Sequence, residues 1–124
     1  MKKRSRKKTR LFLTDRSLRD LAEVEQYSLQ QWGRKKASQY ISQVETSLSL
    51  IVSQPNLLQP IDDFPPCLQY YRINKHVLIF DVQTCDITLL TLFHTSMDLP
   101  TRLAEMQPQL LLEVDLLHRR LEEK

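Results

Sequence analysis

The sequence predicts an α+β fold in which a small, antiparallel-dominated sheet (β-α-α-β-β-β) is backed by a helical hairpin. Two short apolar runs, residues 77–82 and 87–93, flank a polar turn and indicate neighbouring strands. Apolar residues recur at helical spacing between residues 14 and 53, and the only glycine, Gly33, divides that stretch. A third helical pattern over residues 108–122 predicts an additional C-terminal helix.

The first strand is expected over residues 9–13, with a helix directly after it. Thr14 or Asp15 can serve as its N-cap, and residues 17–20 (SLRD) fit the capping-box pattern. We expect this helix to bury one apolar stripe, formed by Leu18, Leu21, Ala22, Leu29 and Trp32. Gly33 follows that stripe, in the position of a left-handed C-cap.

A second helix is expected from about residue 34 to residue 53. Its apolar positions repeat with alternating spacings of four and three, and Tyr40 lies beside them: Ala37, Ile41, Val44, Leu48 and Ile51. Pro55 cannot continue the helix and marks its end. Two such helices with a glycine between them predict an antiparallel helical hairpin.

Prolines and two adjacent aspartates predict an irregular loop over residues 56–66. A strand is expected over residues 67–73, and Asn74 with Lys75 forms a tight turn, because asparagine tolerates positive φ. The last three strands, joined by short turns, must run antiparallel, whereas the first strand can pair in parallel with a later one.

The basic charge of the chain belongs to its first ten residues. They hold seven of the 18 basic residues and no acidic one, so the rest has 11 basic against 15 acidic residues, a net charge of −4. Such a block predicts a disordered, solvated tail over residues 1–8. Contact of this tail with nucleic acid through phosphates is the alternative.

The remaining composition predicts a soluble, cytoplasmic protein with a single core. A chain of 124 residues suffices for one domain, and no apolar run approaches the roughly 20 residues of a membrane span. The basic N-terminus lacks the apolar segment of a secretory signal. Cys67 and Cys85 have no CxxC partner, so we expect two half-buried thiols, no metal site and no cofactor.

The chain resembles the ParE-like branch of the RelE/ParE superfamily, the toxins of bacterial type II toxin–antitoxin modules, over residues 9–103. The match consists of an ordered set of short pieces: Asp20-Leu21, Tyr27, Trp32-Gly33, Ala37, Tyr40, Pro55, Tyr71-Arg72, residues 76–80, Leu92-Phe93-His94, Met97-Asp98 and Arg102-Leu103. The resemblance implies a toxin neutralised by a small antitoxin. Residues 104–124 would be an amphipathic helical extension beyond the usual end of such a toxin.

Members of this superfamily have two different activities. ParE-like toxins act by protein contact on DNA gyrase, a topoisomerase, and are associated with plasmid stabilization and growth inhibition. RelE-like toxins cleave messenger RNA on the ribosome. The net acidic body favours the ParE-like activity, because an enzyme that docks on ribosomal RNA needs a basic working face. A non-toxic, degenerate binding module is the third possibility.

The sequence offers two sets of candidate site residues. A ribonuclease would use His94 as acid or base, Arg72 and Lys75 as phosphate clamps, and Tyr71 for base stacking. The alternatives are that His94 hydrogen-bonds to Asp98 or a backbone carbonyl at a strand end, and that Arg72 pairs with Asp81 or Asp86. The second set would bind partner proteins: Trp32, Arg34, Lys35 and Lys36 at the hairpin tip, and Leu110, Val114 and Leu117 in the C-terminal helix, which could also form a homodimer.

Two features bear on the hairpin tip. Core packing under the hairpin is the expected role of Trp32, with partner binding as its alternative. Three cations, Arg34 to Lys36, are expected to form a solvated helix start, with a docking patch as the alternative. Their placement opposes the helix dipole, and this unfavourable placement indicates a function.

Overall fold

The structure, a computed structural model, describes residues 9–62 and 64–94, together with residues 112, 114, 116 and 118. The chain forms two compact units, residues 1–93 and 94–124. The first unit holds the sheet and the helical hairpin.

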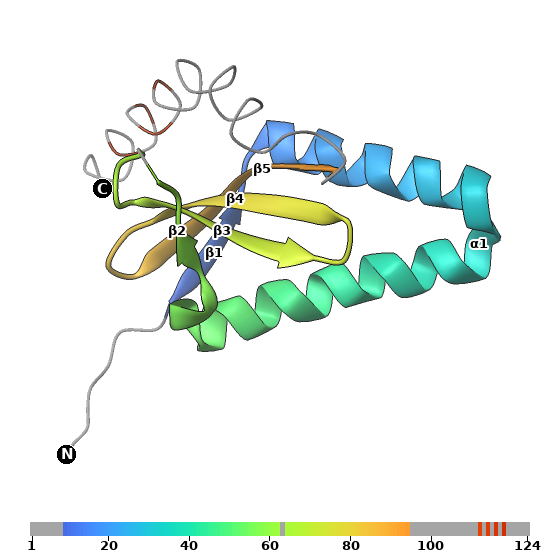
Figure 1. Ribbon diagram of the computed structural model, residues 1–124, viewed down its shortest axis with the longest axis horizontal. Helices are drawn as coiled ribbons and strands as arrows, with labels where there is room; N and C mark the ends of the chain where they lie inside the picture. The colour runs from blue at the N-terminus through green and yellow to red at the C-terminus, as the bar shows by residue number, and fades with distance from the viewer. Residues whose placement is uncertain are drawn as a thin grey trace. The chain divides into compact units, whose positions relative to one another are not determined.

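Five strands form one mixed sheet in the order β1-β5-β4-β3-β2 (Figure 1). Their bounds are Arg10–Leu13 for β1, Gln59–Pro60 for β2, Leu68–Ile73 for β3, His76–Val82 for β4 and Asp86–His94 for β5. β1 pairs in parallel with β5, and β3 pairs antiparallel with both β2 and β4. The α+β class, the parallel first strand and the antiparallel strands that follow are therefore confirmed.

Residues 56–66 contain regular structure that the sequence did not predict. A short 3-10 helix, η1, spans Pro55–Leu57, and the two residues of β2 pair with Tyr70 and Gln69 of β3. The prediction of an irregular loop was wrong here, because proline is tolerated in an edge strand, where its missing N–H group is not needed. Asn74, in the β3–β4 turn, has the positive φ predicted for it, 50°.

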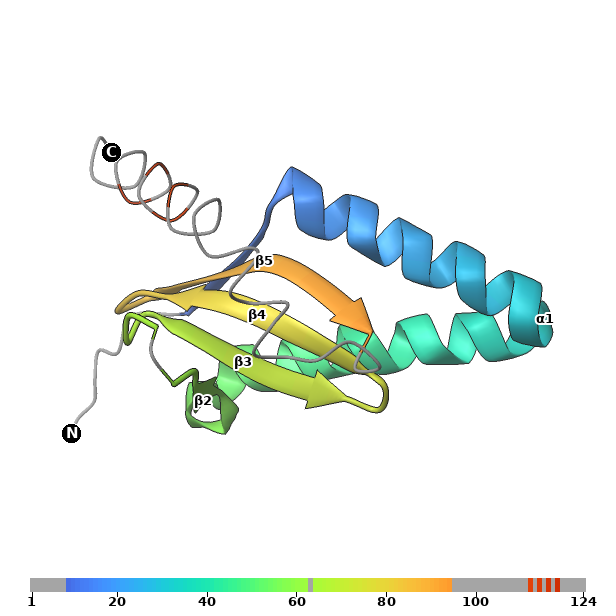
Figure 2. The ribbon, with the colours of Figure 1, turned by 45° about the horizontal axis from the view of Figure 1, so that its top comes forward.

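Helix α1 spans Asp15–Ser53 and bends sharply at Gly33, so its two arms fold back into the predicted hairpin (Figures 1 and 2). Gly33 has φ 88° and ψ 173°. The predicted left-handed C-cap was wrong, since that conformation needs a ψ of about 45°. The observed combination of positive φ with extended ψ is accessible essentially to glycine alone.

The N-cap of α1 is Thr14, whose hydroxyl oxygen accepts a hydrogen bond from the Ser17 N–H at 3.0 Å. The capping box predicted at residues 17–20 was wrong, because Ser17 already lies inside the helix and is fully buried. Its own hydroxyl donates to the Thr14 carbonyl oxygen at 2.8 Å. Asp20 is therefore free to bond elsewhere.

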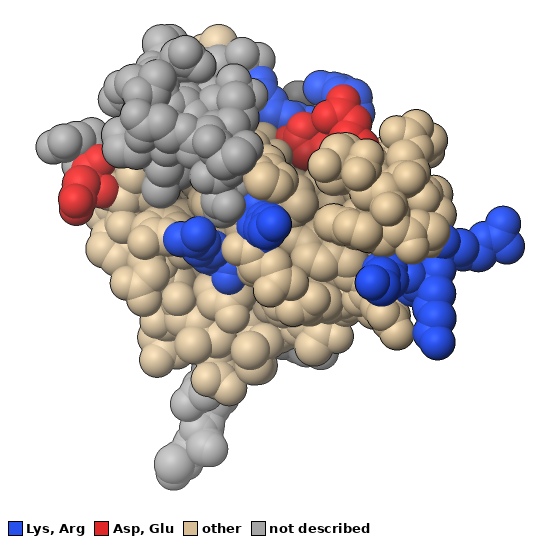
Figure 3. Space-filling model, turned by 45° about the vertical axis from the view of Figure 1, so that its right-hand side comes forward, with Lys and Arg blue, Asp and Glu red and all other residues tan. Residues whose placement is uncertain are grey.

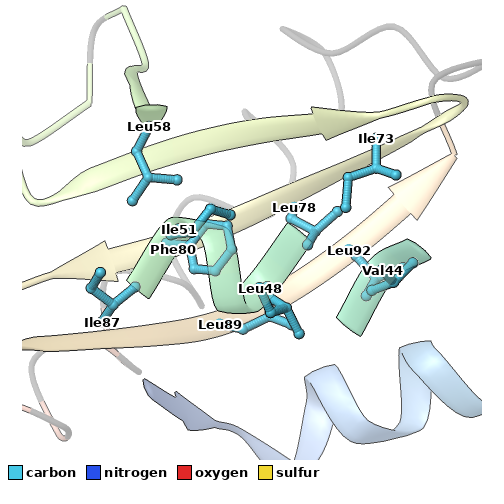
Figure 4. Packing of buried hydrophobic residues seen from close by; sticks show 10 residues of the cluster. All are labelled: Val44, Leu48, Ile51, Leu58, Ile73, Leu78, Phe80, Ile87, Leu89 and Leu92. Atoms are coloured by element: carbon cyan, nitrogen blue, oxygen red, sulfur yellow. The ribbon is translucent and has the colours of Figure 1, made fainter. Parts of the chain in front are cut away.

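The second arm of α1 packs against one face of the sheet as predicted (Figure 4). The core cluster joins this arm to Leu58, the residue after η1, and to three strands: Val44, Leu48, Ile51, Leu58, Ile73, Leu78, Phe80, Ile87, Leu89 and Leu92. Tyr40 packs at its edge. The apolar periodicity of residues 37–51 predicted this face because almost all of its inward positions are apolar.

Of the stripe predicted for the first arm, only Leu21 packs against the core cluster, and the rest of the prediction was wrong. Leu18 and Trp32 are 49% and 51% exposed, and Ala22 and Leu29 are exposed as well. The arm instead turns inward the positions Ser17, Leu21, Val24 and Ser28, at spacings of four, three and four. Two of these four are serines, so the inward face lacks the apolar continuity that identifies a buried stripe. Core packing of Trp32 is likewise contradicted.

In the second unit, residues 112, 114, 116 and 118 are helical, in agreement with the predicted C-terminal helix. Val114 is buried, and Leu112 and Leu116 are exposed. The rest of that helix, including Leu110 and Leu117, lies outside the described residues, as do the tail at residues 1–8 and the short helix predicted over residues 101–107. Among the described helices, none is both long and apolar enough to cross a membrane.

Candidate functional site

The bend of α1 carries an exposed aromatic pair. Tyr27 and Trp32 are 52% and 51% exposed, and their ring centroids lie 6.2 Å apart at an interplanar angle of 89°. This edge-to-face arrangement is a favourable one for aromatic rings. It holds two large apolar side chains in a fixed geometry at the surface, next to Gly33.

Three cations follow the bend directly. Arg34, Lys35 and Lys36 are all exposed, and within the described part of the chain none of them forms an ion pair or a side-chain hydrogen bond. Figure 3 shows basic side chains projecting from the end of the hairpin at the right, beside uncharged surface. The structure thus brings together Trp32, Arg34, Lys35 and Lys36, and adds Tyr27 to them. We call these five residues the hairpin tip.

The ribonuclease candidates Tyr71 and Arg72 point to opposite faces of the sheet. Tyr71 pairs with Leu78 and packs against the core cluster, whereas Arg72 pairs with Val77 and is exposed. Successive residues of a strand alternate between faces, so these two side chains cannot converge on one phosphodiester. The predicted pairing of Arg72 with Asp81 or Asp86 was wrong: among the described residues Arg72 has no ion-pair partner, and Asp86 instead binds Arg10 at 3.0 Å.

The other two ribonuclease candidates lie apart along the chain. Lys75 is exposed in the β3–β4 turn, and His94 is half-buried at the end of β5. The partner predicted for His94, Asp98, lies outside the described residues. The structure therefore confirms the strand-end position of His94.

A contact between Tyr40 and His76, which the sequence did not predict, links the β3–β4 turn to the second arm of α1. The Tyr40 hydroxyl donates to the Ile73 carbonyl oxygen at 3.2 Å and contacts Nδ1 of His76 at 2.5 Å. Gln43 accepts a further bond from the Asn74 side-chain amide at 3.1 Å. Burial raises the pKa of Tyr40, so the phenol remains neutral and can donate throughout the physiological pH range. These contacts fix the turn against the second arm.

Asp20 joins the first arm to β5 at a place where the strand has lost its neighbour. β1 pairs with β5 only as far as Leu89. Beyond that point Thr14 donates to the Leu90 carbonyl oxygen at 2.9 Å, and the Asp20 carboxylate accepts from the Thr91 hydroxyl at 2.5 Å and the Leu92 N–H at 3.2 Å. The sequence singled out Asp20 only in the capping-box pattern and in the Asp20-Leu21 pair of the family match, and neither predicted this contact.

The alternation of core-facing and outward-facing side chains along β5 shifts by one residue at the same place. Ile87 and Leu89 belong to the core cluster, but the next core residue is Leu92 and not residue 91. Regular alternation would have placed Thr91 in the core. Asp20 instead receives both the Thr91 hydroxyl and the Leu92 N–H, so the side chain stabilises the irregular part of β5.

Both cysteines are free and half-buried, as predicted. Cys67 precedes β3, which pairs Leu68 with Asp81 of β4. Asp81 is fully buried and accepts a hydrogen bond from the Gln83 side-chain amide at 3.3 Å. Burial raises the pKa of the Cys67 thiol, and the charge of Asp81 and its hydrogen bond with the thiol raise it further.

We therefore expect Cys67 to react slowly with iodoacetamide near pH 8, because a raised pKa lowers its thiolate fraction at that pH. Asp81→Asn removes the negative charge, so it should lower the pKa of Cys67 and accelerate its alkylation. Mass spectrometry of alkylated peptides between pH 7 and 10 measures the rate. An unchanged pH profile in Asp81→Asn would contradict the role of the carboxylate, and Asp86→Asn provides the control at an aspartate that pairs elsewhere.

Comparison with known proteins identifies the family. A family model described as the ParE toxin of the type II toxin–antitoxin system parDE matches residues 11–99, more than half of the chain. The chain belongs to the ParE toxin family. No curated protein sequence matches it.

Two solved structures show the same fold as this ParE-family chain. The chromosomal ParDE toxin–antitoxin system from P. aeruginosa superposes with a TM-score of 0.60 at 15% identity, over 70% of this chain and 96% of that one. The toxin–antitoxin complex RelBE2 from Mycobacterium tuberculosis gives a TM-score of 0.50 at 15% identity, over 68% of this chain and 94% of that one. At these identities the likeness shows the fold alone, and the family match over residues 11–99 confirms the ParE-like resemblance.

Proposed function

We propose that this ParE-family toxin is silenced by a cognate antitoxin and inhibits DNA gyrase by protein contact in the cytoplasm. The observation that carries the choice of a protein target over messenger RNA is the placement of Tyr71 and Arg72 on opposite faces of the sheet. Cleavage of RNA at the 2′-hydroxyl needs an acid, a base and a charge-stabilising group around one phosphate.

The charge of the body supports the same choice. From residue 11 onward the chain carries a net charge of −4, which opposes approach to the phosphate backbone of ribosomal RNA. The described cations are few, and three of the exposed ones are gathered at the hairpin tip. Such a distribution suits a local contact with one protein better than an extended contact with RNA.

The proposal is tested by adding the purified protein to a DNA supercoiling reaction with gyrase. We expect supercoiling to fall as the toxin concentration rises, and an equimolar amount of the protein encoded beside the toxin gene, the expected antitoxin, to restore it. In cells, induction should arrest growth and trigger DNA-damage signalling while transcripts remain intact. The matched control is the same protein after heat unfolding.

Rapid decay of messenger RNA on induction, with supercoiling unaffected, would contradict the proposal and favour a RelE-like ribonuclease. In that case Arg72→Ala and His94→Ala should each restore growth while the circular dichroism spectrum keeps its helical signal. If induction of the folded protein leaves growth, supercoiling and transcripts unchanged, the chain is a non-toxic binding module.

A further inference from the structure

We infer that the hairpin tip is a docking surface for an acidic protein segment that places an apolar side chain against the Tyr27–Trp32 pair. The segment belongs to the protein on which the toxin acts, and in that respect alone the inference rests on the proposed function. The tip lies at the end of the hairpin, where the bend of α1 projects beyond the strands (Figures 1 and 2).

The aromatic pair supplies the apolar part of this surface. The second arm buries its apolar positions Ala37, Val44, Leu48 and Ile51, whereas Tyr27 and Trp32 leave about half of their surfaces in water. Tyrosine, tryptophan and arginine are the residues most enriched where protein partners bind tightly. Because the two rings already pack against each other, they lose little side-chain entropy when a partner binds.

The backbone of Gly33 is uncrowded by distant parts of the chain. Apart from its neighbours along the chain, a Cβ atom added at Gly33 would meet no heavy atom within 4 Å. No distant segment of this chain therefore occupies the space directly at Gly33, between Trp32 and the cations.

The charge of the tip selects an acidic partner. Arg34, Lys35 and Lys36 are consecutive, exposed and unpaired within the described residues, so their charges are available to carboxylates of another molecule. Complementary charge around an apolar contact raises the rate of association and fixes its orientation.

A protein segment fits this surface better than nucleic acid does. The basic patch is confined to three residues, and the first arm carries exposed acidic residues, Glu23 and Glu25, a short distance before Tyr27. Binding of single strands needs a positive groove that follows the backbone over several nucleotides. A short acidic segment with one apolar anchor needs only the contact that the tip provides.

Trp32 allows a direct test because it is the only tryptophan of the chain. Its fluorescence is followed while the full-length protein is titrated with a short peptide of alternating glutamate and leucine, which contains no tryptophan. We expect a saturable change in emission that weakens with added salt. The triple variant Arg34→Glu/Lys35→Glu/Lys36→Glu and the variant Tyr27→Ala should each bind the peptide at least about tenfold more weakly.

Arg19→Glu is the matched control for Lys35→Glu, because both replace an exposed cation of α1 and change the net charge equally. Lys35→Glu should weaken binding of the peptide, and the Arg19→Glu variant should bind the peptide as tightly as the wild type does. No saturable response, equal affinity of the triple variant, or a stronger response to an oligothymidylate would overturn the inference. So would self-association in sedimentation that the triple variant abolishes, since that result would assign the tip to a second copy.

The gyrase reaction separates this inference from the proposed function. The triple variant should inhibit supercoiling at least about tenfold less than the wild type does, while it still binds the antitoxin. If the wild-type protein itself leaves gyrase active, the proposed target is wrong, and the peptide titration still decides whether the tip binds acidic segments. Loss of antitoxin binding in the triple variant would overturn the assignment of the tip to the target.

Discussion

Asp20→Ala should destabilise the fold by about 3 kcal/mol, because two hydrogen bonds to a charged acceptor contribute roughly 1.5–3 kcal/mol each and the effects within one group are not additive. The Asp20 carboxylate accepts from the Thr91 hydroxyl and from the Leu92 N–H. Thr91 is 3% exposed and Leu92 is 6% exposed, so water cannot readily replace the lost acceptor. Leu92 also belongs to the core cluster, and a local shift of β5 would loosen its packing.

Urea unfolding followed by circular dichroism measures this effect as a lower midpoint. Asp20→Asn is the matched variant, since its amide oxygen can accept the same two bonds without a charge, and it should lose roughly half as much stability. Glu23→Ala removes an exposed carboxylate of the same arm and should leave the midpoint within about 0.5 kcal/mol of the wild type. A wild-type midpoint in Asp20→Ala would show that the contact contributes nothing to stability.

Gly33→Ala should destabilise the protein by about 1–3 kcal/mol through backbone strain alone. The added methyl group meets no neighbouring atom, so the cost comes from the combination of φ 88° and ψ 173°. In the alternative conformation, alanine continues the helix through residue 33 and the two arms no longer fold back. The second arm could then not reach the sheet while the first stays attached through Asp20.

Thermal unfolding tests this expectation, and each 1 kcal/mol should lower Tm by roughly 4–8 °C in a domain of this size. Gln31→Ala is the control, because it places alanine at an exposed helical position of the same bend. A Tm equal to that of the wild type in Gly33→Ala would mean that the bend tolerates an ordinary residue. An increased Tm together with dimerisation would instead indicate exchange of arms between two copies.

Periodicity predicted the parts of the fold whose buried positions are apolar. The second arm of α1 was predicted from Ala37, Val44, Leu48 and Ile51, and the central strands from their uninterrupted apolar runs. The first arm was oriented wrongly because its inward positions include Ser17 and Ser28, whose burial depends on hydrogen bonding and small size. Tertiary contacts determine which side of the first arm is buried, and the local sequence pattern does not reveal those contacts.

The candidate site likewise contains residues that the sequence predicted and residues that it missed. The sequence identified the tip cations, which follow the lone glycine, but assigned Trp32 to the core because an apolar residue at helical spacing is usually buried. It grouped Tyr71 with Arg72 by chemistry, although neighbours in a strand face opposite ways. Asp20 and the Tyr40–His76 contact join segments 71 and 36 residues apart, so only the folded chain reveals them.

The pairing of β1 with β5 determines when the toxin domain can be completed during synthesis. Arg10 and Asp86 are 76 residues apart, and their strands meet beside each other in the sheet. At a synthesis rate of 5–20 residues per second, both arms of α1 precede the last strand by several seconds. Until β5 is made, the apolar stripe of the second arm lacks the strand that supplies Ile87, Leu89 and Leu92 to the core cluster. The incomplete core leaves the nascent chain exposed to proteases and chaperones during that interval.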